Sequence, residues 1–143
     1  MNELGEPTAR LMVRALQAFE NQLQACLHAD GFSDVTVAQT NVLRHLDPEG
    51  MSQRALAQDA NVSKQAISQA VRALQARHLV EVTPDPEDAR AKRVVYTERG
   101  RALIASALPH VLELERRWQE HLGADGYHAL RLGLAQLPDA IER

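Results

Sequence analysis

The chain has 143 residues, of which 45% are apolar, 24% are charged and 3% are aromatic. This size and balance are ordinary for a single soluble domain, and the abundance of Ala and Leu favours a mainly helical fold. The N-terminal segment lacks the hydrophobic region of a signal peptide, and no apolar run reaches the length of a membrane span. The only cysteine, Cys26, excludes an internal disulfide. We therefore expect a cytoplasmic protein that makes no contact with a membrane.

The net charge of −3 is unevenly distributed along the chain. Residues 52–101 contain nine basic and six acidic side chains, whereas the rest of the chain contains seven basic and thirteen acidic ones. A basic third inside an acidic chain fits a nucleic-acid-binding part attached to another part.

Two helices are expected before residue 50. Apolar residues recur every three or four positions along one face of a helix over about residues 7–28, at Met12, Leu16, Phe19, Leu23 and Cys26. Gly31 is expected to end this helix. A second helix is expected over about residues 36–46, and the sequence Asp47-Pro48-Glu49-Gly50 then breaks it.

Two shorter helices, joined by a tight turn, are expected next. Ser52 can cap the first, which reaches about Ala60, and Ser63 can cap the second, which reaches about Arg77. The second helix has an apolar side and a polar side, so the pair forms a helix-turn-helix whose second helix can lie in a DNA major groove. An amphipathic helix is also common in protein cores, so the pair alone does not establish DNA binding.

A hairpin with a basic tip is expected after residue 78. Residues 79–83 and 93–97 have the pattern of strands, and the turn residues 84–88 lie between them. The tip carries Arg90, Lys92 and Arg93, which can enter a minor groove or contact phosphates. A solvated charged turn is the alternative, and the position directly after the helix-turn-helix favours DNA binding.

The remaining sequence predicts helices. Thr97 can cap a long helix from Arg99 to about Leu122, in which Pro109 should introduce a kink and which Gly123 should end. A last helix is expected over about residues 125–141.

The segment Asp88-Ala-Arg90-Ala-Lys92-Arg-Val94-Val-Tyr96-Thr97-Glu-Arg-Gly100 resembles the wing signature of MarR-type winged-helix regulators. That signature has Asp, Arg and Lys at alternate positions, followed by an apolar strand, Thr and Gly. Further stretches resemble the helix-turn-helix of the family and the helix before it: Leu56-Ala57, Val62-Ser63, Leu74…Leu79-Val80 and Thr36…Gln39…Val42-Leu43…Leu46. The resemblance covers essentially the whole chain.

The resemblance implies a mainly α (α+β) fold, a winged helix-turn-helix with N- and C-terminal dimerisation helices. It implies recognition helices in successive major grooves, wings in the flanking minor grooves, and Arg90 inserted at the wing tip. Asp88 would orient Arg90 by a charge-assisted hydrogen bond. The chain departs from the family at His78, where Gly is frequent, and at Gln69, where Arg is frequent.

We therefore expect a single domain over residues 1–143, with a DNA-binding lobe at 36–100 and dimerisation helices at 6–30 and 101–143. Base contacts are expected from four residues of the second short helix, Gln65, Ser68, Gln69 and Arg72. Backbone contacts are expected from Ser63 and Lys64, and wing contacts from Asp88, Arg90, Lys92 and Arg93.

The expected function is sequence-specific binding of double-stranded DNA by a homodimeric repressor that a small organic effector releases. No Gly-rich phosphate loop, nucleophile elbow or metalloprotease motif is present, so we expect no enzyme activity and no cofactor. No metal site is expected either, because the histidines and Cys26 are scattered.

Two alternative functions stay open. One is redox sensing through Cys26, whose place on an apolar stripe also suits a buried hydrophobe. The other is a winged-helix interaction module that binds protein and no DNA, which the net charge of −3 supports.

Overall fold

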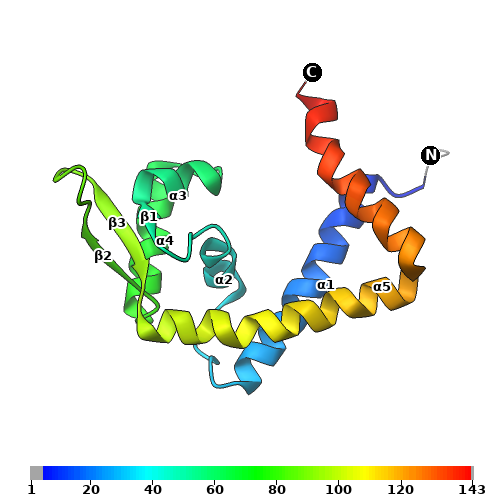
Figure 1. Cartoon of the computed structure of the whole chain (residues 1–143), viewed down its shortest axis with the longest axis horizontal. Helices are drawn as coiled ribbons and strands as arrows, with labels where there is room; N and C mark the ends of the chain where they lie inside the picture. The colour runs from blue at the N-terminus through cyan, green and yellow to red at the C-terminus, as the bar shows by residue number, and fades with distance from the viewer. Residues whose placement is uncertain (1–4, 143) are drawn as a thin grey trace. The chain divides into compact units, whose positions relative to one another are not determined.

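A computed structural model describes residues 5–142 and shows a mainly helical chain with one small antiparallel sheet (Figure 1). The elements in chain order are α1 (Thr8–Ala29), α2 (Val37–Leu43), β1 (Met51–Ser52), α3 (Gln53–Asp59), α4 (Lys64–Ala76), β2 (Val80–Pro84), β3 (Lys92–Tyr96) and α5 (Glu98–Ile141). This confirms the expected mainly α, α+β class. The chain divides into two compact units, residues 1–107 and 108–143. In the part that the structure describes, no helix is long and apolar enough to cross a membrane.

The first two helices begin and end near their predicted residues. Pro7 is the N-cap of α1, and Gly31 follows that helix with a φ of 103°. At the start of α2, the Thr36 side chain accepts from the Gln39 backbone N–H while the Gln39 side chain accepts from the Thr36 N–H, which forms a capping box. Helix α2 ends at Leu43, three residues before its predicted end.

Two serine caps define the helix-turn-helix, as predicted. Ser52 Oγ accepts from the Ala55 N–H at 3.0 Å at the start of α3, and Ser63 Oγ accepts from the Ala66 N–H at 3.0 Å at the start of α4. Between the helices, Asn61 has a φ of 52°, in the left-handed region that Asn tolerates better than most residues. The Val62 N–H then returns to the Ala57 carbonyl, which closes the turn.

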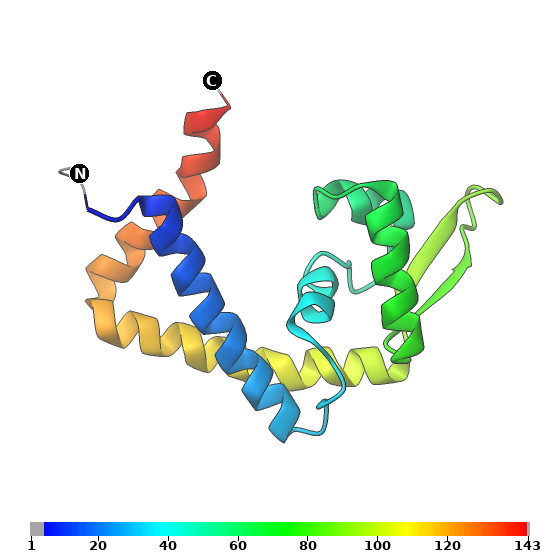
Figure 2. The same ribbon diagram turned by 180° about the vertical axis from the view of Figure 1, so that it is seen from behind.

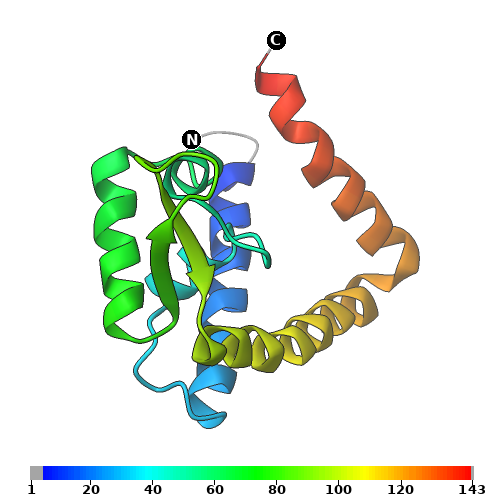
Figure 3. The same ribbon diagram turned by 60° about the vertical axis from the view of Figure 1, so that its left-hand side comes forward.

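The sheet has the strand order β1-β3-β2 and is antiparallel throughout. Strands β2 and β3 form the predicted hairpin, with Val80 opposite Tyr96 and Pro84 opposite Lys92. Strand β1 was not predicted. It is only two residues long and places Ser52 opposite Arg93. Helix α4 packs against β2 (Figure 3).

The core lies in the first unit, where α1 to α4, the sheet and the start of α5 meet. Its most deeply buried side chains include Leu27, Leu56, Ile67, Leu74, Leu79 and Leu103. The predicted apolar side of α4 is therefore confirmed. The predicted apolar face of α1 is buried only toward its C-terminal end, because Leu27 and Leu23 contact the core while Met12 and Leu16 stay exposed.

Helix α5 begins with the predicted threonine cap, because the Gly100 N–H donates to Thr97 Oγ1 at 3.0 Å. The backbone stays helical at Pro109, and the only non-helical residue inside the described helix is Gly123, with φ 75° and ψ 164°. Gly123 therefore ends the first segment of α5, as predicted. In the second unit, Arg116 and Arg117 pair with Glu113 and lower the pKa of that carboxyl to about 2.

Candidate DNA-binding surface

An open groove lies between the helix-turn-helix and the tip of the hairpin. Figures 1 and 2 show the tip of the β2–β3 hairpin at the same end of the first unit as the turn between α3 and α4. The groove is lined from both sides, by Ser52, Gln53, Arg54, Ala57, Gln58, Asn61, Val62, Lys64 and Ser68 of the helix-turn-helix and by Asp88, Arg90, Ala91 and Lys92 of the hairpin. Two motifs that are distant in the sequence thus form one surface.

The groove is positively charged. Arg54 and Lys64 contribute cations from the helix-turn-helix, and Arg90 and Lys92 contribute cations from the hairpin. None of these four side chains takes part in the ion pairs found among residues 5–142. Asp88 is the single acidic residue of the lining. Cations without carboxylate partners in a concave surface favour an anionic ligand such as the phosphates of a nucleic acid.

The outer side of α4 presents polar side chains to solvent. Gln65, Gln69 and Arg72 are exposed and lie outside the groove lining, and their spacing of four and three places them on one helix face. Glutamine amides both donate and accept, which is the pattern that an adenine edge requires. Ser63 is exposed too, but its hydroxyl oxygen is used as the N-cap of α4.

Ser68 lies in a different environment from these residues. It is half-buried on the side of α4 that faces α3, and its Oγ accepts a hydrogen bond of 2.6 Å from Gln53 Nε2. Ser68 thus lies in the groove, beside a partner that sequence reasoning did not identify, and the exposed base-reading candidates lie elsewhere on α4.

Two aspartate side chains stabilise the turn at the hairpin tip. The Oδ1 atoms of Asp85 and Asp88 each accept from the backbone N–H two residues later, on Glu87 and Arg90, at 3.0 Å. The Asp85 N–H also donates to the Ala91 carbonyl. The charge-assisted bond that we expected between Asp88 and the Arg90 guanidinium is replaced by a bond to the Arg90 backbone, because short Asp side chains readily form such turns. The Arg90 side chain is exposed at the tip.

Arg93 does not join the groove. Its Nη2 atom donates to the carbonyls of Glu49 at 2.9 Å and Gly50 at 3.1 Å, so the side chain holds the loop before β1 against β3. Conversely, Gln53 and Arg54 line the groove and were missed by sequence reasoning. The sequence signal that could have identified Arg54 is a basic residue in the first turn of α3, the helix that precedes α4.

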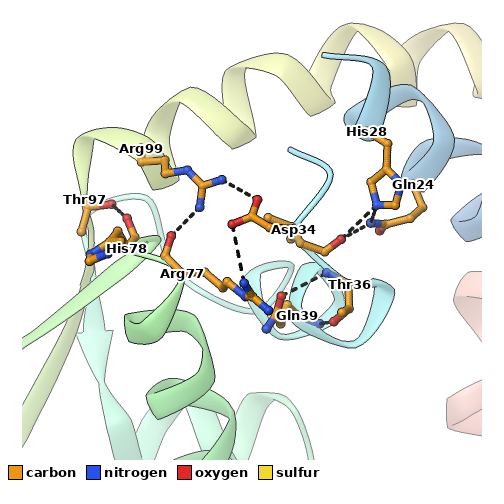
Figure 4. Close-up of polar contacts among 10 residues, drawn as sticks. Gln24, His28, Asp34, Thr36, Gln39, Arg77, His78, Thr97 and Arg99 are labelled. Atoms are coloured by element: carbon orange, nitrogen blue, oxygen red, sulfur yellow. Dashed lines mark hydrogen bonds and ion pairs between the residues drawn. The ribbon is translucent and has the colours of Figure 1, made fainter. Parts of the chain in front are cut away.

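A polar network holds the C-terminal end of α4, as Figure 4 shows. The Arg99 guanidinium donates to Asp34 Oδ1 at 2.6 Å and to the Arg77 carbonyl, and Thr97 Oγ1 donates to the His78 carbonyl. The hydrogen bond from Arg99 lowers the pKa of Asp34 below its ordinary value. His78, where the family often has Gly, adopts a φ of 55° in the left-handed region.

Cys26 is half-buried on α1, and its Sγ lies 3.9 Å from the Gln22 amide nitrogen. A sensor cysteine is activated by a basic side chain or a helix N-terminus beside its thiol. Redox sensing through Cys26 therefore stays an untested alternative.

Comparison with known proteins places the chain in a family. The model of the MarR family matches residues 33–91. The transcriptional repressor CouR, solved with a 23-mer DNA duplex, is 30% identical with a TM-score of 0.77, over 96% of each chain. CouR from Rhodococcus jostii RHA1 bound to p-coumaroyl-CoA is 26% identical with a TM-score of 0.73, over 96% of this chain and 95% of that one.

A third solved structure is that of BpsR from Bordetella bronchiseptica, whose DNA binding is regulated by 6-hydroxynicotinic acid. It is 25% identical with a TM-score of 0.72, over 93% of this chain and 99% of that one. No curated protein matches the chain. The family match over residues 33–91 and the similarity to CouR over nearly the full length show that this chain belongs to the MarR family and is a DNA-binding transcriptional regulator.

Proposed function

We propose that this MarR-family chain is a cytoplasmic repressor that binds duplex DNA as a homodimer and leaves the DNA when a small organic ligand binds. The observation that carries the DNA contacts is the groove, in which four cations from the helix-turn-helix and the hairpin share one surface. The lobe at residues 36–100 contacts DNA, and the helices at 6–30 and 101–143 form the dimer.

In the proposed complex, the exposed face of α4 lies in the major groove. Gln65, Gln69 and Arg72 contact base edges, and the hairpin tip places Arg90 at the flanking minor groove. Lys64 and Lys92 contact phosphates from the two sides of the protein groove. The two α4 helices of a dimer then read successive major grooves, about 34 Å apart.

Exposed apolar side chains support the dimer. In α1 they are Leu11, Met12, Val13 and Leu16, and in the second unit they include Leu108, Leu112, Leu122, Leu130, Leu132, Leu134, Leu137 and Ile141. Soluble monomers rarely expose so many apolar side chains along their helices. Because symmetric dimers are by far the commonest oligomers, we assign the covering partner to a second copy. Light scattering on the purified protein should give the mass of two chains.

The relatives support the repressor role and the release by a ligand. The CouR solved with a 23-mer DNA duplex is described as a transcriptional repressor, and CouR from Rhodococcus jostii RHA1 has been solved with p-coumaroyl-CoA. In BpsR, 6-hydroxynicotinic acid regulates DNA binding. By analogy, a ligand that binds the DNA-free state more tightly shifts this chain away from its operator.

Arg90→Ala tests the proposed DNA contacts. Once selection from random duplexes has given a binding site, fluorescence anisotropy should show binding about tenfold weaker for this variant. The slope of log affinity against log salt concentration is negative, and its magnitude should decrease by about one. The reason is that the variant lacks one cation that contacts a phosphate or the minor groove.

Arg44→Ala is the matched control. It removes the same charge from an exposed side chain just after α2, which pairs with Glu20 and lies outside the groove lining and outside the helices proposed to form the dimer. This variant should bind the site as the wild type does. Equal affinities of Arg90→Ala and wild-type protein at all salt concentrations would contradict the hairpin contact.

A further inference from the structure

Gln53 and Ser68 form a hydrogen-bonded pair on the wall of the groove. We propose that Gln53 is a positioning residue for DNA binding, which turns the Ser68 hydroxyl so that its proton is donated to a phosphate oxygen of the DNA backbone. The inference rests on the proposed function and names the DNA group that this part of the surface takes.

The direction of the hydrogen bond determines what Ser68 can offer. A serine hydroxyl has one proton to donate and two lone pairs that accept. The Gln53 amide N–H donates to Ser68 Oγ at 2.6 Å and so uses one lone pair. The hydroxyl proton then points away from Gln53. A ligand atom that contacts this proton must be a hydrogen-bond acceptor.

The surroundings select a phosphate among the possible acceptors. Both Gln53 and Ser68 line the groove, together with the cations Arg54 and Lys64 on their own side and Arg90 and Lys92 on the other. The one acidic residue of the lining, Asp88, has an oxygen committed to the Arg90 backbone N–H. Because the groove concentrates positive charge, a phosphate is the favoured acceptor, and a donor beside these cations adds a directional contact.

The position of Ser68 on α4 separates it from the base-reading candidates. Gln65, Gln69 and Arg72 are exposed and lie outside the groove lining, whereas Ser68 is half-buried inside it. Helix α4 thus has an outer face that suits bases and a groove side that suits the backbone. Ser68 therefore helps to position the duplex, whereas the outer face of α4 determines which base sequence is bound.

A double-mutant cycle tests the pair. On the selected duplex, Ser68→Ala and Gln53→Met should each weaken binding about fivefold, the effect of losing one hydrogen bond. Methionine keeps the length of the glutamine side chain and removes its donor. The double variant should also lose about fivefold, since the two residues act through one contact. Thermal melting of each variant checks that its fold is retained.

The control cycle combines Gln53→Met with Gln69→Ala. No hydrogen bond joins these two residues among those found in residues 5–142, so their losses should multiply. Two further measurements separate a phosphate contact from a general loosening of the fold. Loss of a neutral donor should leave the salt slope unchanged. Replacing single phosphates of the duplex with uncharged methylphosphonates should reveal one position at which Ser68→Ala and Gln53→Met have no further effect.

Three results would overturn the inference while the wild type still binds DNA. They are multiplied losses in the Gln53–Ser68 cycle, losses that depend on which base pair is present, and a methylphosphonate scan without a shared position. Failure of the wild-type protein to bind any selected duplex would overturn the proposed function and this inference together.

Discussion

Asp34, in the loop between α1 and α2, accepts a hydrogen bond of 2.6 Å from Arg99 in the first turn of α5. The same guanidinium donates to the Arg77 carbonyl at the end of α4 and lies 5.6 Å from the centre of the Phe32 ring. One side chain of α5 therefore fixes the end of α4 and the loop that leads into α2.

This contact makes stability sensitive to acid. Since Arg99 lowers the pKa of Asp34 below its ordinary value of 3.8, the ionised carboxylate stabilises the folded state above that pH. The stabilisation is lost as the pH falls through the lowered pKa. Asp34→Asn should therefore reduce the melting temperature at neutral pH and flatten its decline below about pH 4. Parallel acid limbs of the curves for Asp34→Asn and wild type would contradict this interpretation.

Gly100 is required by close packing. A Cβ atom at this position would lie 2.0 Å from the Leu79 carbonyl oxygen and 3.0 Å from Cδ1 of Tyr96. Gly100→Ala should destabilise the protein by about 1–3 kcal/mol or more, because α5 must move away from the sheet. Urea denaturation measures the loss. Gly133→Ala is the control, since a Cβ there meets nothing within 4 Å, and it should stabilise its helix by up to about 1 kcal/mol.

His78→Gly should stabilise the protein. His78 has a φ of 55°, and the Leu79 N–H after it returns to the Leu74 carbonyl to close the end of α4. Glycine adopts this left-handed conformation without the strain of a Cβ, so we expect a gain of about 1 kcal/mol. His78→Ala keeps the strain and should give no gain. Equal melting temperatures for the Gly and Ala variants would show that the strain is negligible.

Tyr96 links the sheet to the end of α2. Its hydroxyl donates to the Leu43 carbonyl at 2.9 Å, and burial raises its pKa to about 12. Tyr96→Phe should cost about 1 kcal/mol at neutral pH through the lost hydrogen bond.

The raised pKa of Tyr96 also gives an alkaline signature. The neutral phenol stabilises the fold below the ordinary pKa of 10.0, and that stabilisation is lost as the pH rises toward about 12. Stability curves of Tyr96→Phe and wild type should therefore converge in this range. A constant difference in stability between Tyr96→Phe and wild type over this pH range would refute the assignment.

Local signals made much of the fold predictable. Ser52, Ser63 and Thr97 cap the helices that follow them, and Gly123 ends a helix, because each acts on backbone atoms a few residues away. Strand β1 was missed, since two residues have no detectable period.

The residue types of the candidate surface were predictable, whereas most of its side-chain contacts were not. The basic tip and the polar side of α4 were found from residue type and spacing. The hydrogen bond from Gln53 to Ser68 joins two helices, and the bonds from Arg93 reach a loop more than forty residues earlier. Such contacts depend on tertiary packing, so a pattern along the chain does not contain them. For Gly100, in contrast, the sequence identified the residue and the structure explains why it is glycine. It was recognised by resemblance, and the approach of Leu79 to Gly100 supplies its physical reason.

Ser52 is at once the strand residue opposite Arg93 and the N-cap of α3. A hairpin that swung outward would pull this residue from the sheet and uncap the first helix of the helix-turn-helix. Because α3 packs on α4, we expect the hairpin and the helix-turn-helix to move together, with a nearly constant distance between the two elements that are proposed to contact DNA. The proposed releasing ligand would then have to move the hairpin and the helix-turn-helix together. Its effect should appear in the preferred spacing of paired DNA sites and leave the affinity of a single lobe for one half-site unchanged.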